Sequence, residues 1–487
     1  MGKNKNQIGI TVKKNDDIVE WYSQVVLKSE LADYSAVKGC AVIRPLGYSL
    51  WQGIMDYFND RLKILGVKNA YFPLFIPESF FYREADHVEG FAPEVAWIER
   101  KSEGEERVAV RPTSETIMYD SYSKWIRSYR DLPLRINQWA NIVRWEVKDV
   151  KIFLRSREFL WQEGHCVYET EEECDHEAEL MIKEYKRLSE DLLAIPVVIG
   201  KKSEKEKFPG AKYTYTIEAF MPDGKALQSG TSHNLGTGFA KAFDIKFKGR
   251  DEKDHYPWQS SWGFSTRLLG ALIMTHGDDK GLVLPPKISP TKVVIVPIIN
   301  KKYPEQNKKV LERSQEIKKS LELAGLSVEL DDREEYSPGF KFSHWELKGV
   351  PLRMEFGPRD LENNSAILVK RNNNEKITVS LDELVEKVKN LLDMIQNELL
   401  EHARQEVDSR TVNPQTYDEF VKATTQDGCL AIINHCGDAL CEDEIKAETG
   451  GVTSRCRPMG DDTPSKGAVC LKCGKPAKYK IIFSRNY

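Results

Sequence analysis

The first 285 residues alternate between long amphipathic stretches and short strand-like segments. Apolar side chains recur at helical spacing between Tyr48 and Leu65, whereas the segment from Ala70 to Ile76 has the composition of a strand. The two periodicities, 3.6 and 2 residues, distinguish helix from strand. Residues 1–285 are therefore predicted to form one α+β domain.

A proline-rich break separates that region from a second pattern. The sequence GLVLPPKISP places a double proline and a Ser-Pro pair near residues 283–290, which disfavours helix and indicates a linker. An apolar run from Val293 to Pro297, a polar helix from about Glu305 to Ala324 and a strand from Leu326 to Leu330 follow. This order predicts a βαβ unit, and hence a small parallel or mixed sheet, within residues 286–404.

A helix from Leu381 to about Glu406 ends the second region. Its apolar residues share one face, which we interpret as a stripe that packs on a core. They are Leu384, Val388, Leu391, Ile395 and Leu399. A third, small domain is expected over residues 405–487.

Two short cysteine pairs in this last region form the most specific spacing signal. Cys436 and Cys441 enclose four residues, Cys470 and Cys473 enclose two, and 28 residues separate the pairs. Each pair can turn tightly onto one ion, so the spacing predicts structural Zn²⁺ held by four thiolates. Such a site leaves no open coordination position for catalysis.

The cysteine content leaves two further interpretations open and bears on location. The cysteines could be reduced and metal-free, and Cys429 and Cys456, which we interpret as packed thiols, could replace a ligand. An odd total of nine cysteines favours metal thiolates over disulfides. The opening MGKNKNQ has no signal-peptide apolar region, and no apolar run approaches the roughly 18 residues of a membrane span. We expect a cytoplasmic protein without membrane contact.

Charge limits the nucleic acids that this chain can bind. The net charge is −4 at pH 7, so general affinity for polyanions such as DNA is not expected. Positive charge is local: from Ser465 to Tyr487 there are six Lys or Arg residues and no acid. RNA contacts, if present, are expected at such local patches.

Arginine, aromatic and acidic residues concentrate between Gln138 and Tyr168. Strand-like alternation of Trp139, Asn141, Val143 and Trp145 predicts one buried face, which leaves Arg144 and Glu146 for the other face or a cleft. A returning strand places six residues on one face: Arg155, Arg157, Phe159, Trp161, Glu163 and His165. Guanidiniums suit phosphate or carboxylate, and rings suit a purine or an apolar ligand. An exposed hairpin covered with salt bridges is the alternative.

Three segments resemble the signature motifs of class II aminoacyl-tRNA synthetases in their prolyl version. The segment similar to motif 1 is RPLGYSLWQGIMDYFNDRLKILGVKNAYFPLFIP, and the segment similar to motif 2 is RWEVKDVKIFLRSREFLWQEGH. The segment similar to motif 3 is SSWGFSTRLLGALIMTHGDDKGLVLPP. The loops RPTSET and LQSGTSHNLG are similar to those of the prolyl branch. The resemblance covers nearly the whole chain. It implies an antiparallel sheet flanked by helices, with motif 1 forming the interface of a homodimer.

The tail resembles that of the archaeal and eukaryotic-like form of the family. Motifs 2 and 3 lie too close together for the large editing insert of the common bacterial form. The terminal Tyr487 is similar to the family's terminal tyrosine, whose carboxylate points toward the catalytic domain.

The resemblance implies activation of L-proline by ATP, carried as its Mg²⁺ complex, and transfer of the prolyl group to tRNA(Pro). Arg144 is expected to bridge the proline carboxylate and the α-phosphate, and Arg267 to hold the γ-phosphate. Further expected ATP contacts are Glu146, Arg155, Phe159, Gln228 and Thr231. Expected proline contacts are Thr113, Glu115, Arg144, Trp161, Glu163, His165, His233 and Ser261. A purely structural role stays open for both histidines, Gln228, Thr231 and Ser261.

Residues 291–404 resemble the anticodon-binding domain shared by the glycyl, histidyl, threonyl and prolyl enzymes, with SPGFKFSHWELKGVPLRMEFGPRD as its core. Phe342, Glu346 and Arg353 are candidates for reading the two guanines of proline anticodons, because unstacked bases are bound by rings and charged edges. An internal salt bridge between Glu346 and Arg353 is the alternative.

Three other functions compete with this interpretation. A threonyl or seryl specificity is the nearest, although a threonyl enzyme requires a zinc-binding Cys and His set in its catalytic domain. A non-catalytic paralogue that acts as a binding module is disfavoured by the presence of both Arg144 and Arg267. The last is a zinc-dependent scaffold that binds RNA without chemistry.

Overall fold

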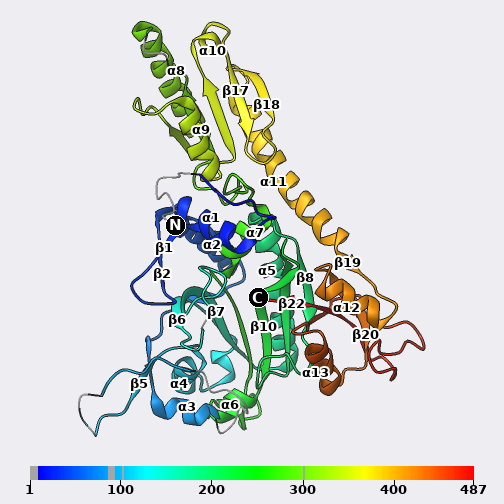
Figure 1. Ribbon diagram of the computed structural model, residues 1–487. Helices are drawn as coiled ribbons and strands as arrows, with labels where there is room; N and C mark the ends of the chain where they lie inside the picture. The colour runs from blue at the N-terminus through cyan, green and yellow to red at the C-terminus, as the bar shows by residue number, and fades with distance from the viewer. Residues whose placement is uncertain (1–8, 86–93, 101, 103, 148, 300–301) are drawn as a thin grey trace.

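The computed structural model describes residues 9–85, 94–100, 102, 104–147, 149–299 and 302–487. A large sheet forms the centre of the molecule, and a smaller domain stands above it (Figure 1). Six neighbouring strands of the large sheet are, in spatial order, β8 (Val197–Lys201), β9 (Tyr213–Phe220), β10 (Lys225–Gly236), β13 (Trp258–Ser265), β7 (Glu158–Tyr168) and β6 (Leu134–Val143). Each pairs antiparallel with the next. The predicted antiparallel α+β fold is confirmed.

Helix α5 (Glu171–Arg187) packs across this sheet against β9, β10 and β13. Its start is encoded locally, since the Thr170 hydroxyl accepts from Glu173 N at 3.3 Å while Thr170 N donates to the Glu173 carboxylate at 3.1 Å. This reciprocal capping satisfies two backbone N–H groups, those of Thr170 and Glu173, that would otherwise lack partners at the helix end.

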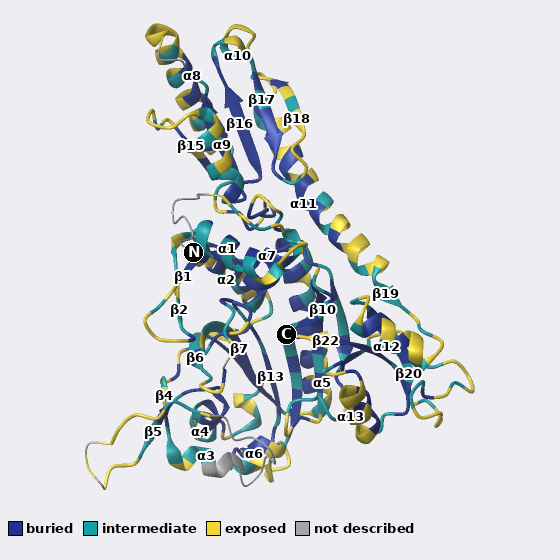
Figure 2. Ribbon diagram, in the orientation of Figure 1, coloured by how far each residue is buried: buried dark blue, intermediate teal, exposed yellow. Residues whose placement is uncertain are grey.

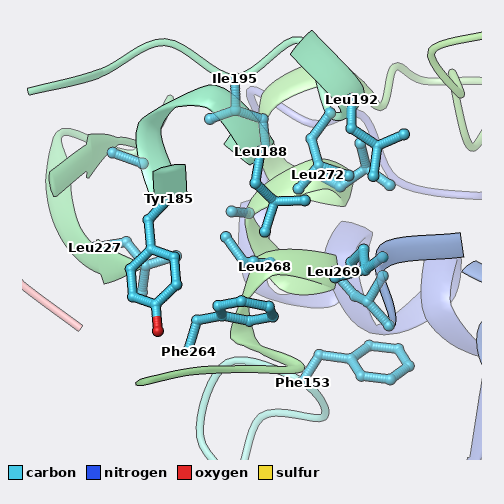
Figure 3. Close-up of a cluster of buried hydrophobic side chains, with 14 of the residues drawn as sticks. Phe153, Tyr185, Leu188, Leu192, Ile195, Leu227, Phe264, Leu268, Leu269 and Leu272 are labelled. Atoms are coloured by element: carbon cyan, nitrogen blue, oxygen red, sulfur yellow. The ribbon is translucent and has the colours of Figure 1, made fainter. Parts of the chain in front are cut away.

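The main hydrophobic core lies between the sheet and four helices: α1 (Ile18–Lys28), α2 (Pro45–Ile64), α5 and α7 (Arg267–His276). Figure 3 shows part of it, where Tyr185, Phe264 and Leu268 come together. Burial of each such side chain contributes about 1.5–3 kcal/mol. This packing fixes the start of α7, which carries Arg267, against the sheet.

The strand predicted from Ala70 to Ile76 is wrong over most of its length. Only two residues pair before it, in β3 (Lys68–Asn69), and strand structure resumes in β4 (Phe75–Pro77). Side chains satisfy the backbone in between: Phe72 N donates to the Gln138 amide oxygen at 2.5 Å, and Arg111 Nη1 donates to Phe72 O at 2.8 Å. A neighbouring strand is therefore not needed there.

The predicted buried face of the first hairpin strand is also wrong. Strand β6 ends at Val143, before Arg144 and Glu146, and Trp145 is 41% exposed. Arg157 lies over the Trp145 ring with its guanidinium carbon 4.6 Å from the centroid, so the ring is covered by a cation instead of a core. The chain thus leaves the sheet where Arg144 begins.

The second region folds into a mixed sheet, as predicted. Its spatial order is β15 (Val328–Leu330), β14 (Val293–Pro297), β16 (Leu352–Phe356), β17 (Ser365–Lys370) and β18 (Lys376–Ser380). The first three are parallel and the last two pair antiparallel. The helices are α8 (Pro304–Leu323), α9 (Pro338–Leu347), α10 (Pro358–Glu362) and α11 (Leu384–Ser409). All five residues of the predicted stripe on α11 are buried, and Figure 2 shows exposed residues on its other side.

The C-terminal region extends the central sheet. Its elements are β19 (Thr411–Val412), α12 (Tyr417–Thr425), β20 (Leu430–His435), α13 (Ala439–Glu448), β21 (Thr453–Pro458) and β22 (Tyr479–Asn486). Strand β21 pairs with β8, and the end of β22 pairs parallel with β10. The last residues of the chain therefore lie against the first domain, and the Tyr487 hydroxyl donates to Asp223 at 2.8 Å.

Shorter elements complete the first domain. They are β1 (Ala32–Tyr34), β2 (Ala41–Ile43), α3 (Glu78–Ala85), β5 (Val108–Val110), α4 (Glu115–Trp125), a short 3-10 helix (Tyr129–Asp131), a short π-helix (Leu188–Leu192), α6 (Gly238–Ala242), β11 (Phe247–Lys248) and β12 (Asp254–His255). Across the described ranges, no helix combines the length and apolar character needed to cross a membrane.

Candidate active site

A cavity of about 710 Å³ opens on the central sheet. Strands β7, β9, β10 and β13 supply its wall, together with the residues that follow β6 and those at the start of α4 and α7. Most of the predicted ATP and proline residues line this one cavity: Thr113, Glu115, Arg144, Glu146, Phe159, Trp161, Glu163, His165, Gln228, Thr231, His233, Ser261 and Arg267. Segments more than 150 residues apart in the sequence thus meet at one site.

Two guanidiniums line the cavity from separate elements. Arg144 Nε donates to Pro112 O at 3.4 Å, and Arg267 Nη1 donates to Gln228 O at 3.1 Å. Neither forms an ion pair with any residue that the structure describes. Burial lowers the pKa of Arg267 to about 10, and Arg144 lowers it further by repulsion, so Arg267 keeps its charge at neutral pH. Two partly buried cations without a carboxylate partner among the described residues form a candidate site for an anion.

An aromatic wall adjoins the first guanidinium. The Arg144 guanidinium carbon is 5.7 Å from the Phe159 ring centroid and 5.9 Å from that of Trp161. The two rings lie two residues apart on β7, both partly exposed, at 83° to each other. A flat aromatic or apolar ligand can pack here beside the cation.

The inner end of the cavity holds a network of acids and hydroxyls. Glu163 Oε1 accepts from Ser114 Oγ at 2.5 Å and from Gln138 Nε2 at 2.8 Å, while its Oε2 lies 3.1 Å from His165 Nε2. Nearby, the Thr113 hydroxyl donates to Glu115. Carboxylates gathered on one side of the cavity suit an ammonium group, whereas the guanidiniums suit phosphate.

The two histidines of the cavity are in opposite electrostatic settings. Burial acts to lower the pKa of His165, but the hydrogen bond to Glu163 and the charges of Glu115 and Glu163 outweigh it and raise that pKa. Burial lowers the pKa of His233 to about 3, with repulsion from His165, and His233 Nδ1 lies 2.8 Å from the Thr214 hydroxyl. His233 is therefore neutral, and both side chains have hydrogen-bond partners within the protein.

Arg155 departs from the prediction. It is exposed and precedes β7, in a turn whose Lys151 and Arg155 backbones bond to each other, and it does not line the cavity. The prediction placed Arg155 on the face of β7 by alternation, but β7 begins only at Glu158, and the turn before it interrupts that alternation. Its charge still acts on Arg267, where it contributes to the lowered pKa.

Sequence reasoning missed a cationic and acidic edge of the cavity. The segment after β8 contributes Lys202, Glu206, Lys207 and Phe208 to the lining. The charge-rich run KKSEKEKF resembles a solvated loop in composition. Only its position directly after a strand of the central sheet could have indicated a role.

The predicted zinc cysteines converge in the C-terminal region. Cys441 Sγ lies 3.8 Å from Cys470 Sγ, and Cys473 Sγ lies 3.6 Å from Cys436 Sγ. Tetrahedral zinc with Zn–S bonds of about 2.3 Å requires sulfur atoms roughly 3.8 Å apart, so this donor set fits the ion. Cys456 is buried beside Ile482, which agrees with the prediction that its thiol packs in a core.

A fifth donor, missed in the sequence, lies beside the cysteines. His435, Cys436, Cys441 and Cys470 hold ligand atoms within 4.8 Å of one another. His435 Nδ1 accepts from Gly437 N at 3.0 Å, and its buried Nε2 has no hydrogen-bond partner among the described residues. Its place immediately before Cys436 was the available signal.

The anticodon candidates lie together on α9 and β16. Arg353 pairs with Glu346 and with Glu355, both at 3.0 Å, and its guanidinium carbon is 4.2 Å from the Phe342 ring centroid. The internal salt bridge that competed with base recognition is thus present. The pair also lies close to the first domain, because Lys280 Nζ is 3.6 Å from Glu346.

Three protein families match successive parts of the chain. The tRNA synthetase class II core domain (G, H, P, S and T) matches residues 97–276, the anticodon binding domain matches 292–391, and the prolyl-tRNA synthetase C-terminal family matches 417–487.

Several bacterial proteins are similar over the full length. The chain is 51% identical over 476 residues to the proline–tRNA ligase of Acetoanaerobium sticklandii, which covers 97% of each chain. It is 48% identical over 489 residues to the proline–tRNA ligase of Lachnospira eligens, and 48% over 490 residues to proline–tRNA ligase 2 of Clostridioides difficile. Both of these matches cover 100% of each chain.

Proposed function

We propose a division of roles among the cavity residues, starting from the fact that this chain belongs to the proline–tRNA ligase family of the class II aminoacyl-tRNA synthetases. The protein is a ligase that activates L-proline with ATP to prolyl-adenylate and transfers the prolyl group to the 3′ end of tRNA(Pro). One observation carries the assignment of roles: two guanidiniums that form no ion pair with a described residue and a group of carboxylates line the same cavity.

The guanidinium end is proposed to hold ATP. Adenylate formation is an in-line attack of the proline carboxylate on the α-phosphate, so it needs positioning and charge stabilisation but no covalent nucleophile. Arg144 bridges the carboxylate and the α-phosphate, and Arg267 holds the γ-phosphate. Adenine stacks on Phe159, and the adenine amino group donates a hydrogen bond to Glu146. Gln228 and Thr231 contact the nucleotide, and Arg155 approaches the β- and γ-phosphates from the rim.

Mg²⁺ belongs to the substrate complex in this scheme. The ion would bind phosphate oxygens and retained waters in preference to a cage made of protein ligands, and it would neutralise part of the phosphate charge.

The carboxylate end is proposed to hold proline. Thr113 and Glu115 take the secondary ammonium, because a carboxylate opposite an ammonium forms a charge-assisted hydrogen bond. The remaining contacts shape the ring pocket: Trp161, Glu163, His165, His233 and Ser261. Apolar contacts discriminate a missing methylene by only about 1–3 kcal/mol, so alanine and cysteine are expected to compete weakly.

The other two regions are proposed to serve tRNA binding and stability. We place the domain boundaries at residues 1–285, 286–404 and 405–487, and the last of these boundaries falls within α11 (Leu384–Ser409). Phe342, Glu346 and Arg353 read the anticodon, which requires their ion pair to open or to offer its free edges to a base. Structural Zn²⁺ is held by Cys436, Cys441, Cys470 and Cys473. A homodimer in the cytoplasm is the expected state of the enzyme.

Pyrophosphate exchange tests this function directly. ATP–pyrophosphate exchange is measured with each of the amino acids in turn. Exchange that depends on proline supports the proposal. Exchange that depends on threonine or serine indicates another specificity, and silence with every amino acid indicates a binding module.

A further inference from the structure

A buried charge triplet joins the C-terminal region to the wall of the cavity. Glu218 Oε1 accepts from Lys202 Nζ at 2.8 Å, and Glu218 Oε2 accepts from Arg455 Nη2 at 2.8 Å and Nε at 3.1 Å. All three side chains are at most 5% exposed. Lys202 and Glu218 belong to the first domain, whereas Arg455 lies on β21 of the C-terminal region.

The triplet lies at the phosphate end of the cavity. Glu218 is paired across β9 and β10 with Gln228, whose carbonyl oxygen accepts from Arg267. The same face of β9 carries Thr214, which lines the cavity, and Thr216, whose hydroxyl donates to Glu218 at 2.9 Å. Lys202 itself lines the cavity.

The charges of the triplet do not cancel. One carboxylate faces two cations, so the group carries a net charge of +1 in a site with little water. Glu218 stays ionised, because the charges of Arg455 and Lys202 outweigh burial and hold its pKa at about 2. Without Arg455, the carboxylate would neutralise Lys202 completely. Arg455 therefore leaves the Lys202 ammonium electrostatically available to an anion in the cavity.

We propose that Lys202 is a further contact for the triphosphate of ATP and that Arg455 is a positioning residue, which keeps Lys202 available by sharing Glu218. The inference rests on the proposed function, since it assigns the triphosphate to this end of the cavity. It makes the C-terminal region part of the ATP site through Arg455 without direct contact with the nucleotide.

Charge-restoring variants test this inference in the full-length, zinc-loaded enzyme. Arg455→Met sets the net charge of the triplet to 0 and is expected to raise the KM for ATP in proline-dependent pyrophosphate exchange about tenfold, because a charge-assisted contact is weakened. The KM for proline is expected to stay within about twofold. In Glu218→Gln/Arg455→Met the net charge returns to +1, so the KM for ATP is expected to recover toward the wild-type value. Lys202→Met should match the defect of Arg455→Met.

Arg457→Met is the matched control. Arg457 lies two residues along the same strand and pairs with Asp462 at 2.6 Å, away from the cavity lining. Its KM for ATP is expected to be unchanged, and zinc content and thermal unfolding are compared for all variants. Equal changes in both KM values, or a double variant no better than Arg455→Met, would overturn the inference. Absence of exchange in the wild-type enzyme would instead count against the proposed function.

Discussion

The guanidinium of Arg371 donates hydrogen bonds to both carboxylate oxygens of Asp278, with Nη1 2.7 Å from Oδ2 and Nη2 2.6 Å from Oδ1. Asp278 follows α7, the helix that begins with Arg267, whereas Arg371 follows β17 of the second domain. Arg371 Nε also donates to the backbone oxygen of Glu346 at 2.9 Å. One side chain thus links the anticodon candidates to the end of the helix that carries a cavity arginine.

Arg371→Met is expected to destabilise the junction between these domains. A bidentate pair to a charged group is worth about 1.5–3 kcal/mol, and Asp278 is 40% exposed, so we expect about 1.5 kcal/mol. Urea unfolding of Arg371→Met, Asp278→Asn and the double variant measures the coupling. Additive effects of the two single changes would show that the pair contributes nothing of its own.

Arg144→Ala should abolish proline-dependent pyrophosphate exchange, with a loss of at least about 10²–10³-fold, because it removes the charge that we propose to face the reacting phosphate. Zinc content should be intact, since Arg144 lies far along the chain from the metal cysteines. Arg187→Ala, on the outer side of α5 and 47% exposed, serves as the control. Wild-type turnover in Arg144→Ala would remove the central assignment.

The pair of His165 and Glu163 should make stability depend on pH. The pKa of His165 is raised in the folded protein, so the stabilisation is fully present below the unfolded value of about 6.5 and is lost as pH rises through the folded pKa. The difference in free energy of unfolding between wild type and Glu163→Gln is therefore expected to be larger at pH 6 than at pH 9. Urea titrations at four pH values, at constant zinc, measure it. A difference that does not change with pH contradicts the role of this pair.

Zinc binding should require four thiolates. Cys441→Ser and Cys473→Ser are expected to lose the ion, whereas His435→Asn and the buried control Cys456→Ser keep one zinc per chain, measured by atomic emission. Structural zinc contributes roughly 10 kcal/mol or more to the fold around it, so loss should expose the C-terminal region to proteolysis. Loss of zinc in His435→Asn together with retention of zinc in Cys473→Ser would show that His435, and not Cys473, is the fourth ligand.

Arg353→Met should separate the two steps of the reaction. If Arg353 contacts the anticodon, its removal lowers kcat/KM for tRNA in aminoacylation about 10–100-fold, the equivalent of one charged hydrogen bond. Proline-dependent pyrophosphate exchange does not involve tRNA and should be unchanged. Lys376→Met removes another cation beside Glu355, at 3.2 Å, and is the control. Equal aminoacylation by both variants would leave Arg353 with a structural role only.

Local sequence patterns predicted the elements that are encoded by the spacing of apolar residues along the chain. The stripe on α11 depends on spacing within one helix, and the βαβ unit around α8 depends on the order of three adjacent elements, both of which a sequence displays directly. The strand over residues 70–76 failed, because Gln138 and Arg111 reach it from other segments and satisfy its backbone. The face that Arg155 was predicted to share with Phe159 is wrong for a related reason, since a turn interrupts the alternation that linked the two residues.

The chemistry of the site divides in the same way. Residue types were enough to propose the arginines, acids and cysteines, because phosphate, ammonium and zinc each require particular donor atoms, and those atoms are properties of the residues. The triplet of Lys202, Glu218 and Arg455 could not be inferred, because Lys202 follows β8, Glu218 lies on β9, and Arg455 on β21 is more than 230 residues distant. Only the tertiary structure decides which charged side chains lie close together away from water. At such short distances, the neighbouring charges determine whether a cation is neutralised or remains available to a substrate.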